Sequence, residues 1–429
     1  MSCRTAMRLS SAPMSDPPHG RAAAAASQRQ HIQRSATPRL ARHAAEGSGA
    51  VRHILVVEAV TAGLCGEATE LLAEGAAMWR AILDDLAALP GVRVATVAAA
   101  AFRQRLTPPA HVATTWLASP AAWPQWWRDS RTVADTVLLI APETDGLLER
   151  LAAEAGAKGF LSDPATIALC ADKLRLAEHC GRHRVPHVPT LPEDWSAPPA
   201  SDEFPCVIKP RDGAGCQKTW RCAAVADWWR AGEALHAEGV AAVRQPWIAG
   251  RTLSVAGRFV DGVASPLFPI AEQHITCDER GRLSYRGGRL PAELHPAVAH
   301  QIADLVDAAG AALPGLQGYV GFDVLLPRSV IPQPVDPRSQ TSDPLFQPSD
   351  PRSQPGDPRS QPGDHFSQTV DAAPILCEIN PRWTTSYVGY RRLCTSSLMA
   401  ALLSRGEEVP RLEWRTAVVS FDAEGHVTG

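Results

Sequence analysis

Cys377-Glu378-Ile379-Asn380-Pro381-Arg382 is the stretch that decides the fold of this chain, together with Gly321-Phe322-Asp323-Val324-Leu325-Leu326. Both are short apolar runs of the kind expected for buried strands. Alternation along a strand places Glu378 and Asn380 on one face and the isoleucine between them on the other, so two oxygen ligands point together. If the two runs pair as a hairpin, Asp323 adds a third.

Carboxylate and amide oxygens are the ligands that magnesium accepts, and magnesium commonly leaves its other positions to water and nucleotide phosphates. Either acid alone is more typical of a strand cap or a salt bridge. The combination favours a metal, because unpaired buried acids are costly. Asp323, Glu378 and Asn380 are therefore predicted to bind Mg²⁺ together with ATP, with Mn²⁺ as an alternative ion.

Residues 328–374 separate the two runs and contain a tandem repeat. Asp-Pro pairs recur there at seven-residue intervals within Asp-Pro-Arg-Ser-Gln-like units. Seven is also the coiled-coil period, but repeated proline removes backbone donors and excludes a helix, so we expect an exposed, extended or disordered loop. The repeat is either an inert expansion or a proline-rich segment that a partner recognises.

A second signal lies upstream, where the apolar run 205–209 ends in Lys209 and continues into the loop Gly213-Ala214-Gly215. Lysine offers a point charge to a phosphate, and the glycines let backbone N–H groups approach the same anion. The loop is neither a P-loop nor a Rossmann fingerprint. Farther upstream, Lys173 follows Asp172 at the start of an expected helix, where a lysine is usually a solvated surface residue.

The first ordered residues predict an α/β unit. Apolar runs at 53–58, 92–98 and 136–141 are typical of buried parallel strands. Between the first two, residues 71–89 carry apolar side chains at spacings of three and four, as on one face of a helix. Residues 51–160 are therefore expected to form the first ordered domain.

Bulk composition narrows the possible functions. The chain has 429 residues, 45% apolar residues and a formal net charge of -3, so more than one domain is expected and nothing indicates a nucleic-acid partner. No run approaches the ~20 apolar residues that a membrane span needs. The ten cysteines form no C-x-x-C pair and are expected to be reduced thiols.

The segment before residue 51 is arginine-rich, acid-poor and without an apolar period, which predicts a disordered tail over 1–50. It lacks the apolar centre of a secretory signal. An organelle transit peptide is the alternative, as is a start at Met14. A cytoplasmic location is the default expectation.

Taken in order, five features resemble an ATP-grasp enzyme over about 160–400. They are Asp172-Lys173, Val207-Ile208-Lys209-Pro210 with its glycine loop, Gln245-Pro246-Trp247-Ile248-Ala249-Gly250, Phe322-Asp323 and Glu378-Ile379-Asn380-Pro381-Arg382. The run Leu55-Val56-Val57-Glu58, the pair Glu74-Gly75 and the segment 380–389 further resemble the tyramine–glutamate ligases of methanofuran biosynthesis.

The resemblance implies a role for each matching residue. Lys173 and Lys209 would contact nucleotide phosphates, and Gly213, Ala214 and Gly215 would close over them. Gln245, Trp247 and Ile248 would belong to the hinge whose backbone binds adenine. Arg382 would lie beside the transferring phosphoryl group, and Thr384, Thr385 and Ser386 would face the acceptor substrate.

Two positions depart from the family pattern. The hinge of relatives often reads Gln-Glu, where this chain has Pro246, and an acidic residue often follows the glycine, where this chain has Thr252. The resemblance therefore leaves the ribose contacts of this chain open. The insert also interrupts the metal hairpin, so the metal-site geometry depends on the loop staying outside it.

The implied architecture is α/β and α+β: an ATP-grasp fold of two α+β lobes clasping ATP, preceded by an α/β pre-ATP-grasp domain. The predicted domains are the tail 1–50, the pre-ATP-grasp domain 51–160, the central lobe 161–244, and the C-terminal lobe 245–429 with the insert 328–374.

The implied activity is an ADP-forming carboxylate–amine ligase that works through an acyl phosphate, with Lys209 and Arg382 as catalytic residues. A role in making a one-carbon carrier follows from the narrower resemblance. An ATP-grasp phosphotransferase and a non-catalytic ATP-binding regulatory protein are the alternatives. Small-molecule carboxylate and amine substrates are expected, with no nucleic-acid or membrane partner. A homo-oligomer is left open.

Overall fold

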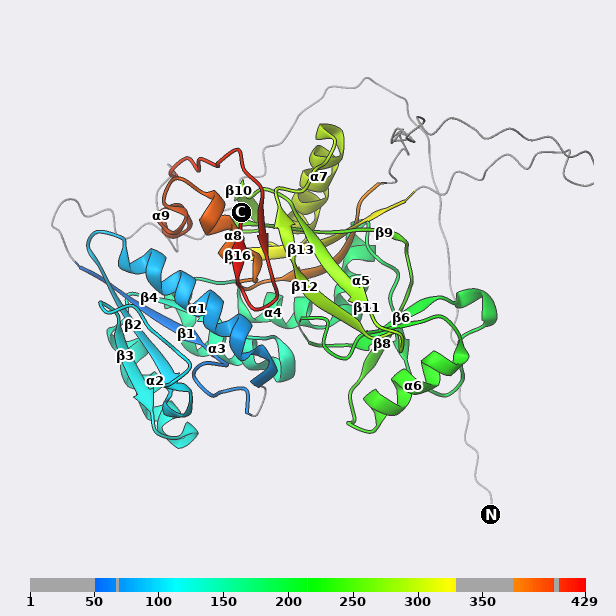
Figure 1. The fold of residues 1–429 in the computed structure, drawn as a ribbon, viewed down its shortest axis with the longest axis horizontal. Helices are drawn as coiled ribbons and strands as arrows, with labels where there is room; N and C mark the ends of the chain where they lie inside the picture. The colour runs from blue at the N-terminus through cyan, green and yellow to red at the C-terminus, as the bar shows by residue number, and fades with distance from the viewer. Residues whose placement is uncertain (1–50, 67–68, 214, 329–372, 405–408) are drawn as a thin grey trace, which may run out of the picture. The chain divides into compact units, whose positions relative to one another are not determined.

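A parallel sheet forms the first part of the chain in the computed structural model, which describes residues 51–66, 69–213, 215–328, 373–404 and 409–429 (Figure 1). The strand order is β3-β2-β1-β4. The strands are β1 (Arg52–Glu58), β2 (Val92–Ala99), β3 (Ala113–Leu117) and β4 (Thr136–Ile140). The expected tail 1–50 and nearly all of the insert 328–374 lie outside the described residues.

Both faces of this sheet are covered because its strands are apolar on both sides. In β1, Ile54 and Val56 point into one core, and Leu55 and Val57 point into another. Helix α1 (Leu72–Ala87) packs into the first core, and α2 (Trp123–Val133) and α3 (Leu147–Ala155) pack into the second. The N-terminal part of the chain thus has the expected α/β architecture, and the domain bounds 51–160 stay a prediction.

A small antiparallel sheet follows, in the order β5-β8-β6-β7. Its strands are β5 (Leu191–Glu193), β6 (Cys206–Pro210), β7 (Trp220–Cys222) and β8 (Ala242–Pro246). Helix α6 (Val225–His236) packs on it through the fully buried Trp228. Helices α4 (Pro164–Ala171) and α5 (Lys173–His183) precede it in the chain.

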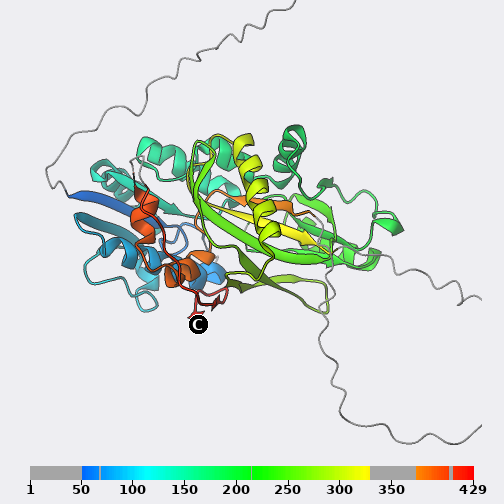
Figure 2. The ribbon, with the colours of Figure 1, turned by 90° about the horizontal axis from the view of Figure 1, so that it is seen from above.

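The largest sheet has eight strands, in the order β14-β13-β9-β11-β12-β15-β16, with β10 paired to β9. These are β9 (Gly250–Val260), β10 (Val263–Leu267), β11 (Ala271–Cys277), β12 (Leu283–Leu290), β13 (Gly318–Pro327), β14 (Ile375–Asn380), β15 (Val419–Phe421) and β16 (Val427–Thr428). Helix α7 (Pro296–Ala312), drawn yellow-green, lies across one face and shares a core with β9 and β13 (Figure 2).

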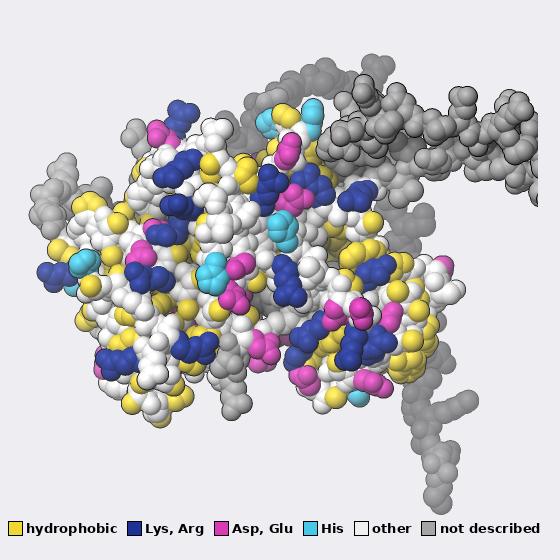
Figure 3. Space-filling view, viewed as in Figure 1, with side chains coloured by type: hydrophobic (Ala, Val, Ile, Leu, Met, Phe, Trp, Pro, Cys, Tyr) yellow, Lys and Arg dark blue, Asp and Glu magenta, His cyan; other side chains and the backbone are white. Residues whose placement is uncertain are grey.

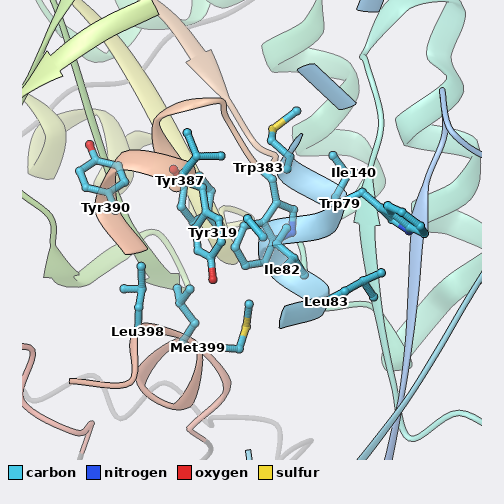
Figure 4. Packing of buried hydrophobic residues seen from close by; sticks show 14 of the residues in the cluster. Trp79, Ile82, Leu83, Ile140, Tyr319, Trp383, Tyr387, Tyr390, Leu398 and Met399 are labelled. Carbon is cyan, nitrogen blue, oxygen red and sulfur yellow. The ribbon is translucent and has the colours of Figure 1, made fainter. Parts of the chain in front are cut away.

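Helix α8 (Ser386–Leu393) and α9 (Leu398–Leu403) connect the large sheet to the N-terminal domain through one shared core. Tyr319 stacks on Trp383 with ring centroids 4.8 Å apart, and Tyr387 meets the Trp383 ring edge-on (Figure 4). Ile82 of α1 belongs to the same cluster. Asp85 of α1 accepts a hydrogen bond from the Tyr387 hydroxyl at 2.6 Å, so the segment after β14 is anchored to the N-terminal domain.

The structure confirms the predicted strand pair at 322–326 and 375–379. β13 and β14 are antiparallel neighbours, and Asp323 lies directly opposite Glu378. The predicted helix after Asp172 is also present, with the Asp172 carboxylate capping α5.

The described surface shows no large area of one charge on the face drawn in Figure 3, where Lys and Arg side chains are interspersed with Asp and Glu. Within the described ranges, every helix is too short or too polar to cross a bilayer.

Candidate functional site

A cavity of about 420 Å³ brings the predicted site residues together. We call it the main cavity. Strands β6, β8, β9, β11, β13 and β14 contribute to its walls. Its lining includes Lys173, Lys209, Gly213, Gly215, Gln245, Trp247, Ile248, Asp323, Glu378, Asn380 and Arg382. Thr384, Thr385 and Ser386 line it as well, and Ala214 lies outside the described residues.

The two predicted metal-binding carboxylates come from neighbouring strands. Glu378 and Asn380 line the cavity while Ile379 lies in the core behind, as the alternation predicts. The register shifts just after Asp323, because Val324 pairs with Leu376 and leaves Cys377 as a bulge. The bulge turns the Cys377 side chain to the cavity as well, which strand alternation alone does not predict.

Asp323 is held by amide groups on both sides. The side chains of Gln273 and Asn380 donate to its two oxygens at 2.8 and 2.9 Å. Burial and the charge of Glu378 raise the pKa of Asp323 to about 6. A carboxylate in this setting is stabilised by a cation, so the site fits a divalent ion bound by oxygen ligands.

The opposite carboxylate, Glu378, is surrounded by positive charge. Burial alone would raise its pKa, but Lys173 and Lys209 outweigh burial and lower the pKa to about 2. The described residues contain no group of three His, Cys, Asp or Glu side chains arranged around a metal position. The candidate ligand set is therefore two carboxylates and one amide, a hard oxygen set that suits magnesium better than zinc.

Two buried lysines share that single glutamate. Lys209 Nζ lies 2.7 Å from Glu378 Oε1, and Lys173 Nζ lies 4.0 Å from Oε2 and donates to the Gly213 carbonyl at 3.0 Å. Each lysine is only 8% exposed. The surplus positive charge is suited to an anion such as a phosphate.

Local structure explains how Lys173 reaches this position. Asp172 caps α5 by accepting from the backbone N–H groups of Leu174 and Arg175. Its carboxylate also binds the Arg211 guanidinium at 2.8 and 2.7 Å, which ties the helix start to the end of β6. The Lys173 side chain thus starts beside the glycine loop.

The glycine loop has backbone conformations that side chains rarely adopt. Gly213 has φ +133° and Gly215 has φ +67°. Their missing side chains leave the loop backbone open toward the cavity, as backbone recognition of an anion requires.

The hinge segment 245–248 is partly committed to internal contacts. The Gln245 amide donates to the Thr190 hydroxyl at 2.8 Å, and the Trp247 N–H donates to the Pro205 carbonyl at 3.0 Å. Within the described chain, no backbone hydrogen bond of the Ile248 N–H is present. The Thr252 hydroxyl ties β9 to β11 by donating to the Gln273 carbonyl.

Arg382 joins the large sheet to the N-terminal domain. Its Nε lies 2.6 Å from a carboxylate oxygen of Glu143, which is 5% exposed and follows the carboxyl end of β4. A second nitrogen of Arg382 donates to the Asn380 side-chain oxygen at 3.3 Å. Burial opposes the charge of Arg382, but Glu143 outweighs it and raises the pKa of the guanidinium.

Several residues that the sequence analysis assigned no role also line the site. Glu74 accepts a hydrogen bond from the Thr385 hydroxyl, and Gln273 binds Asp323. Tyr285, Cys216 and Cys377 line the cavity too. For Glu143 a signal was present, because the carboxyl ends of parallel strands meet at one edge of a sheet, where ligands commonly bind.

Comparison with known proteins agrees with this architecture. The model of the ATP-grasp domain matches residues 170–342, and the model of the pre ATP-grasp 3 domain matches residues 92–162. The first match ends before Glu378 and Asn380. No curated protein matches the chain.

Solved structures share the fold at low sequence identity. An ATP-grasp superfamily protein from Archaeoglobus fulgidus is 21% identical, with a TM-score of 0.55, 86% of this chain covered and 92% of the other. A carboxyaminoimidazole ribonucleotide synthase from Aspergillus clavatus, complexed with ATP, is 16% identical, with a TM-score of 0.54 and coverages of 87% and 82%. With both family models and the same fold in these structures, the chain belongs to the ATP-grasp superfamily and carries a pre-ATP-grasp domain ahead of its ATP-grasp domain.

Proposed function

We propose that this chain is an ATP-dependent carboxylate–amine ligase that forms an amide through an acyl phosphate and releases ADP. The observation that carries the proposal is the convergence, in one cavity, of two buried lysines, Arg382 and the Asp323–Glu378 pair. Phosphoryl transfer from ATP depends mainly on positioning and on charge stabilisation, which these side chains supply.

The nucleotide would lie between the hinge and the glycine loop. Trp247 and Ile248 would bind the adenine through their backbone, and Gln245 would keep the hinge in place through Thr190. Lys173 and Lys209 would bind the phosphates, with the backbone of the 213–215 loop above them.

Asp323, Glu378 and Asn380 would hold Mg²⁺, or Mn²⁺ in its place, which neutralises charge between phosphate oxygens when it is bound. When the metal and phosphates are in place, Glu378 no longer has to balance both lysines alone. Arg382 is held by its ion pair with Glu143 and would stabilise charge on the transferring group.

The acid substrate would attack the γ-phosphoryl group with a carboxylate oxygen, and ADP would leave. An amine would then attack the carbonyl carbon of the acyl phosphate, breaking its bond to the phosphate oxygen and yielding an amide. No protein nucleophile is required. Closure of the glycine loop would keep water from the acyl phosphate.

The substrates belong to the proposal in its finer form. A role in assembling a one-carbon carrier, with glutamate and tyramine-like amines as substrates, is supported by the resemblance of Glu58, Glu74-Gly75 and the 380–389 segment to tyramine–glutamate ligases. A cytoplasmic location and the absence of nucleic-acid and membrane partners are further parts of this proposal.

The test is the release of ADP and phosphate from purified chain with MgATP, screened over glutamate and other acids, alone and with amines. The ligase predicts release that requires both an acid and an amine, together with an amide detected by mass. Hydroxylamine added with the acid alone should trap the acyl phosphate as a hydroxamate. Transfer of phosphate to a stable acceptor would favour the phosphotransferase, and a chain that binds no MgATP would overturn the proposal.

A further inference from the structure

A second, smaller cavity, which we call the end chamber, is lined mostly by residues of the N-terminal domain, together with Gly215, Arg382 and Trp383. Its volume is about 40 Å³, and it shares Glu74, Gly215 and Arg382 with the main cavity. Since a water needs about 10–15 Å³ by this measure, the end chamber has room for about three non-hydrogen atoms. Such a space fits one end of a substrate, not a nucleotide.

The end chamber carries more negative than positive charge. Glu58 and Glu74 both line it, and neither forms an ion pair with any Lys, Arg or His of the described chain. The one cation in its wall, Arg382, is already paired with Glu143. A ligand that enters the end chamber therefore meets two carboxylates without a cationic partner.

Glu58 is the more unusual of the two. It is 2% exposed, and its oxygens accept from the backbone N–H groups of Val60 and Thr61, at 3.1 and 2.6 Å. Burial raises the pKa of Glu58 to about 7, and the charge of Glu74 contributes in the same direction. Burying a carboxylate without a cation is costly, so a cation beside Glu58 would lower that cost.

Helix α1 is built to leave room for this carboxylate. A Cβ atom at Gly75 would lie 2.8 Å from the carboxyl atoms of Glu58, which only a residue without a side chain avoids. The next chamber residue on α1, Met78, joins Ile140 and Trp383 in an apolar wall. The end chamber thus combines two carboxylates with an apolar lining.

We propose that the end chamber is the subsite for the ammonium group of the amine substrate, bound by Glu74 and Glu58, with Met78, Ile140 and Trp383 around the first carbon atoms. This inference rests on the proposed function, because it presumes that an amine is a substrate. It identifies the amine as a primary ammonium with an unbranched carbon next to it. A carboxylate or phosphate would be repelled by the same two glutamates.

The experiment is a direct binding measurement on the full chain, by saturation-transfer NMR with ethylammonium as the probe. Ethylammonium matches the size of the end chamber and is protonated at neutral pH. Ethanol, which has the same shape without the charge, is the matched ligand. MgADP affinity is measured in the same samples.

We expect saturation transfer to ethylammonium and much less to ethanol. Glu74→Gln and Glu58→Gln should each reduce the transfer to ethylammonium about tenfold, because a charge-assisted contact is lost. Glu70→Gln removes the same charge from the exposed turn before α1 and should leave the transfer unchanged.

The outcomes separate the subsite from the proposed function. Equal transfer to ethanol and ethylammonium, or transfer that both chamber variants retain in full, overturns the subsite. A wild-type chain that binds MgADP but not ethylammonium also overturns the subsite and leaves the ligase proposal standing. A chain that binds neither overturns both. If one chamber variant fails to fold, as its lost MgADP affinity would reveal, the wild-type comparison of the two ligands still decides.

Discussion

The main cavity and the end chamber differ in how their buried charges are paired. We call the part of the main cavity around Lys173, Lys209, Glu378 and Arg382 the phosphate end. At the phosphate end, the cationic side chains already have partners of opposite sign: Lys209 binds Glu378, and Arg382 binds Glu143. In the end chamber, Glu58 and Glu74 have none within the described chain. Paired groups hold their geometry before a ligand arrives, while unpaired groups select a ligand by its charge.

Breaking the Glu143–Arg382 ion pair should have the largest effect on stability, because Arg382 is buried and lines both cavities. Glu143→Ala leaves a buried guanidinium without its partner, which costs about 3–5 kcal/mol in the free energy of unfolding. Denaturant titration of Glu143→Ala, Arg382→Ala and the double variant measures it. The double variant should lose less than the sum of the single losses, by about 1–3 kcal/mol. Strict additivity would show that the two side chains do not stabilise each other.

Removing the charge at the phosphate end should affect turnover more than folding. Glu378→Gln should lower ADP release at least about 100-fold, because it removes a proposed metal ligand and the partner of both lysines. The matched control is Glu233→Gln, which removes an exposed carboxylate from α6 that does not line the main cavity. Normal turnover in Glu378→Gln would remove this residue from the proposed metal set.

In the end chamber, the titration of Glu58 should make the free energy of unfolding depend on pH. The folded-state pKa of Glu58, about 7, lies above its ordinary value of 4.5. Between these values the folded chain holds a proton that the unfolded chain has lost, so the contribution is full below 4.5 and is lost as the pH rises through 7. The loss is about 3 kcal/mol.

Glu58→Gln should flatten this decline, as measured by denaturant titration across the same pH range. Asp323 contributes a decline of the same sign, because its pKa is also raised, to about 6. The relevant quantity is therefore the difference in slope between wild type and variant. Parallel curves of unfolding free energy against pH for wild type and variant would mean that burial does not raise the pKa of Glu58.

The smallest effect is expected in the glycine loop. Gly215→Ala and Gly66→Ala place a side chain at φ +67° and φ +60°, and an added Cβ meets no close atom at either position. Each should cost about 1 kcal/mol of stability, since both enforce a left-handed conformation. Only Gly215→Ala should also weaken MgATP binding, measured by calorimetry. Equal affinities in the two variants would separate the loop from phosphate recognition.

Local sequence patterns were sufficient for one part of the site and insufficient for another. The apolar runs at β1, β6, β13 and β14 predicted their strands, and strand alternation predicted that Glu378 and Asn380 share a face. The order of the ATP-grasp motifs then predicted that Lys173, Lys209 and Asp323 share one site, and all three line the main cavity.

The contacts that complete the site come from pairs far apart in the chain. Glu143 and Arg382 are separated by 239 positions, and Glu74 and Thr385 by 311. No periodic pattern reports such pairs, since they depend on how the N-terminal sheet packs against the segment after β14. The bulge at Cys377 was equally hidden, because strand alternation from Glu378 assigns the apolar Cys377 side chain to the core face.

The strand pair β13–β14 opens at the end away from its two carboxylates. The chain leaves at Pro327, four residues beyond Asp323, a distance of about 13 Å along a strand. Whatever length of polypeptide connects Pro327 to Ile375, the register that aligns Asp323 with Glu378 is set by the strands themselves and by β9 on the other side. A change in the number of seven-residue repeats therefore leaves this register unchanged. For the same reason, the connection after Pro327 is a suitable position for inserting a reporter domain.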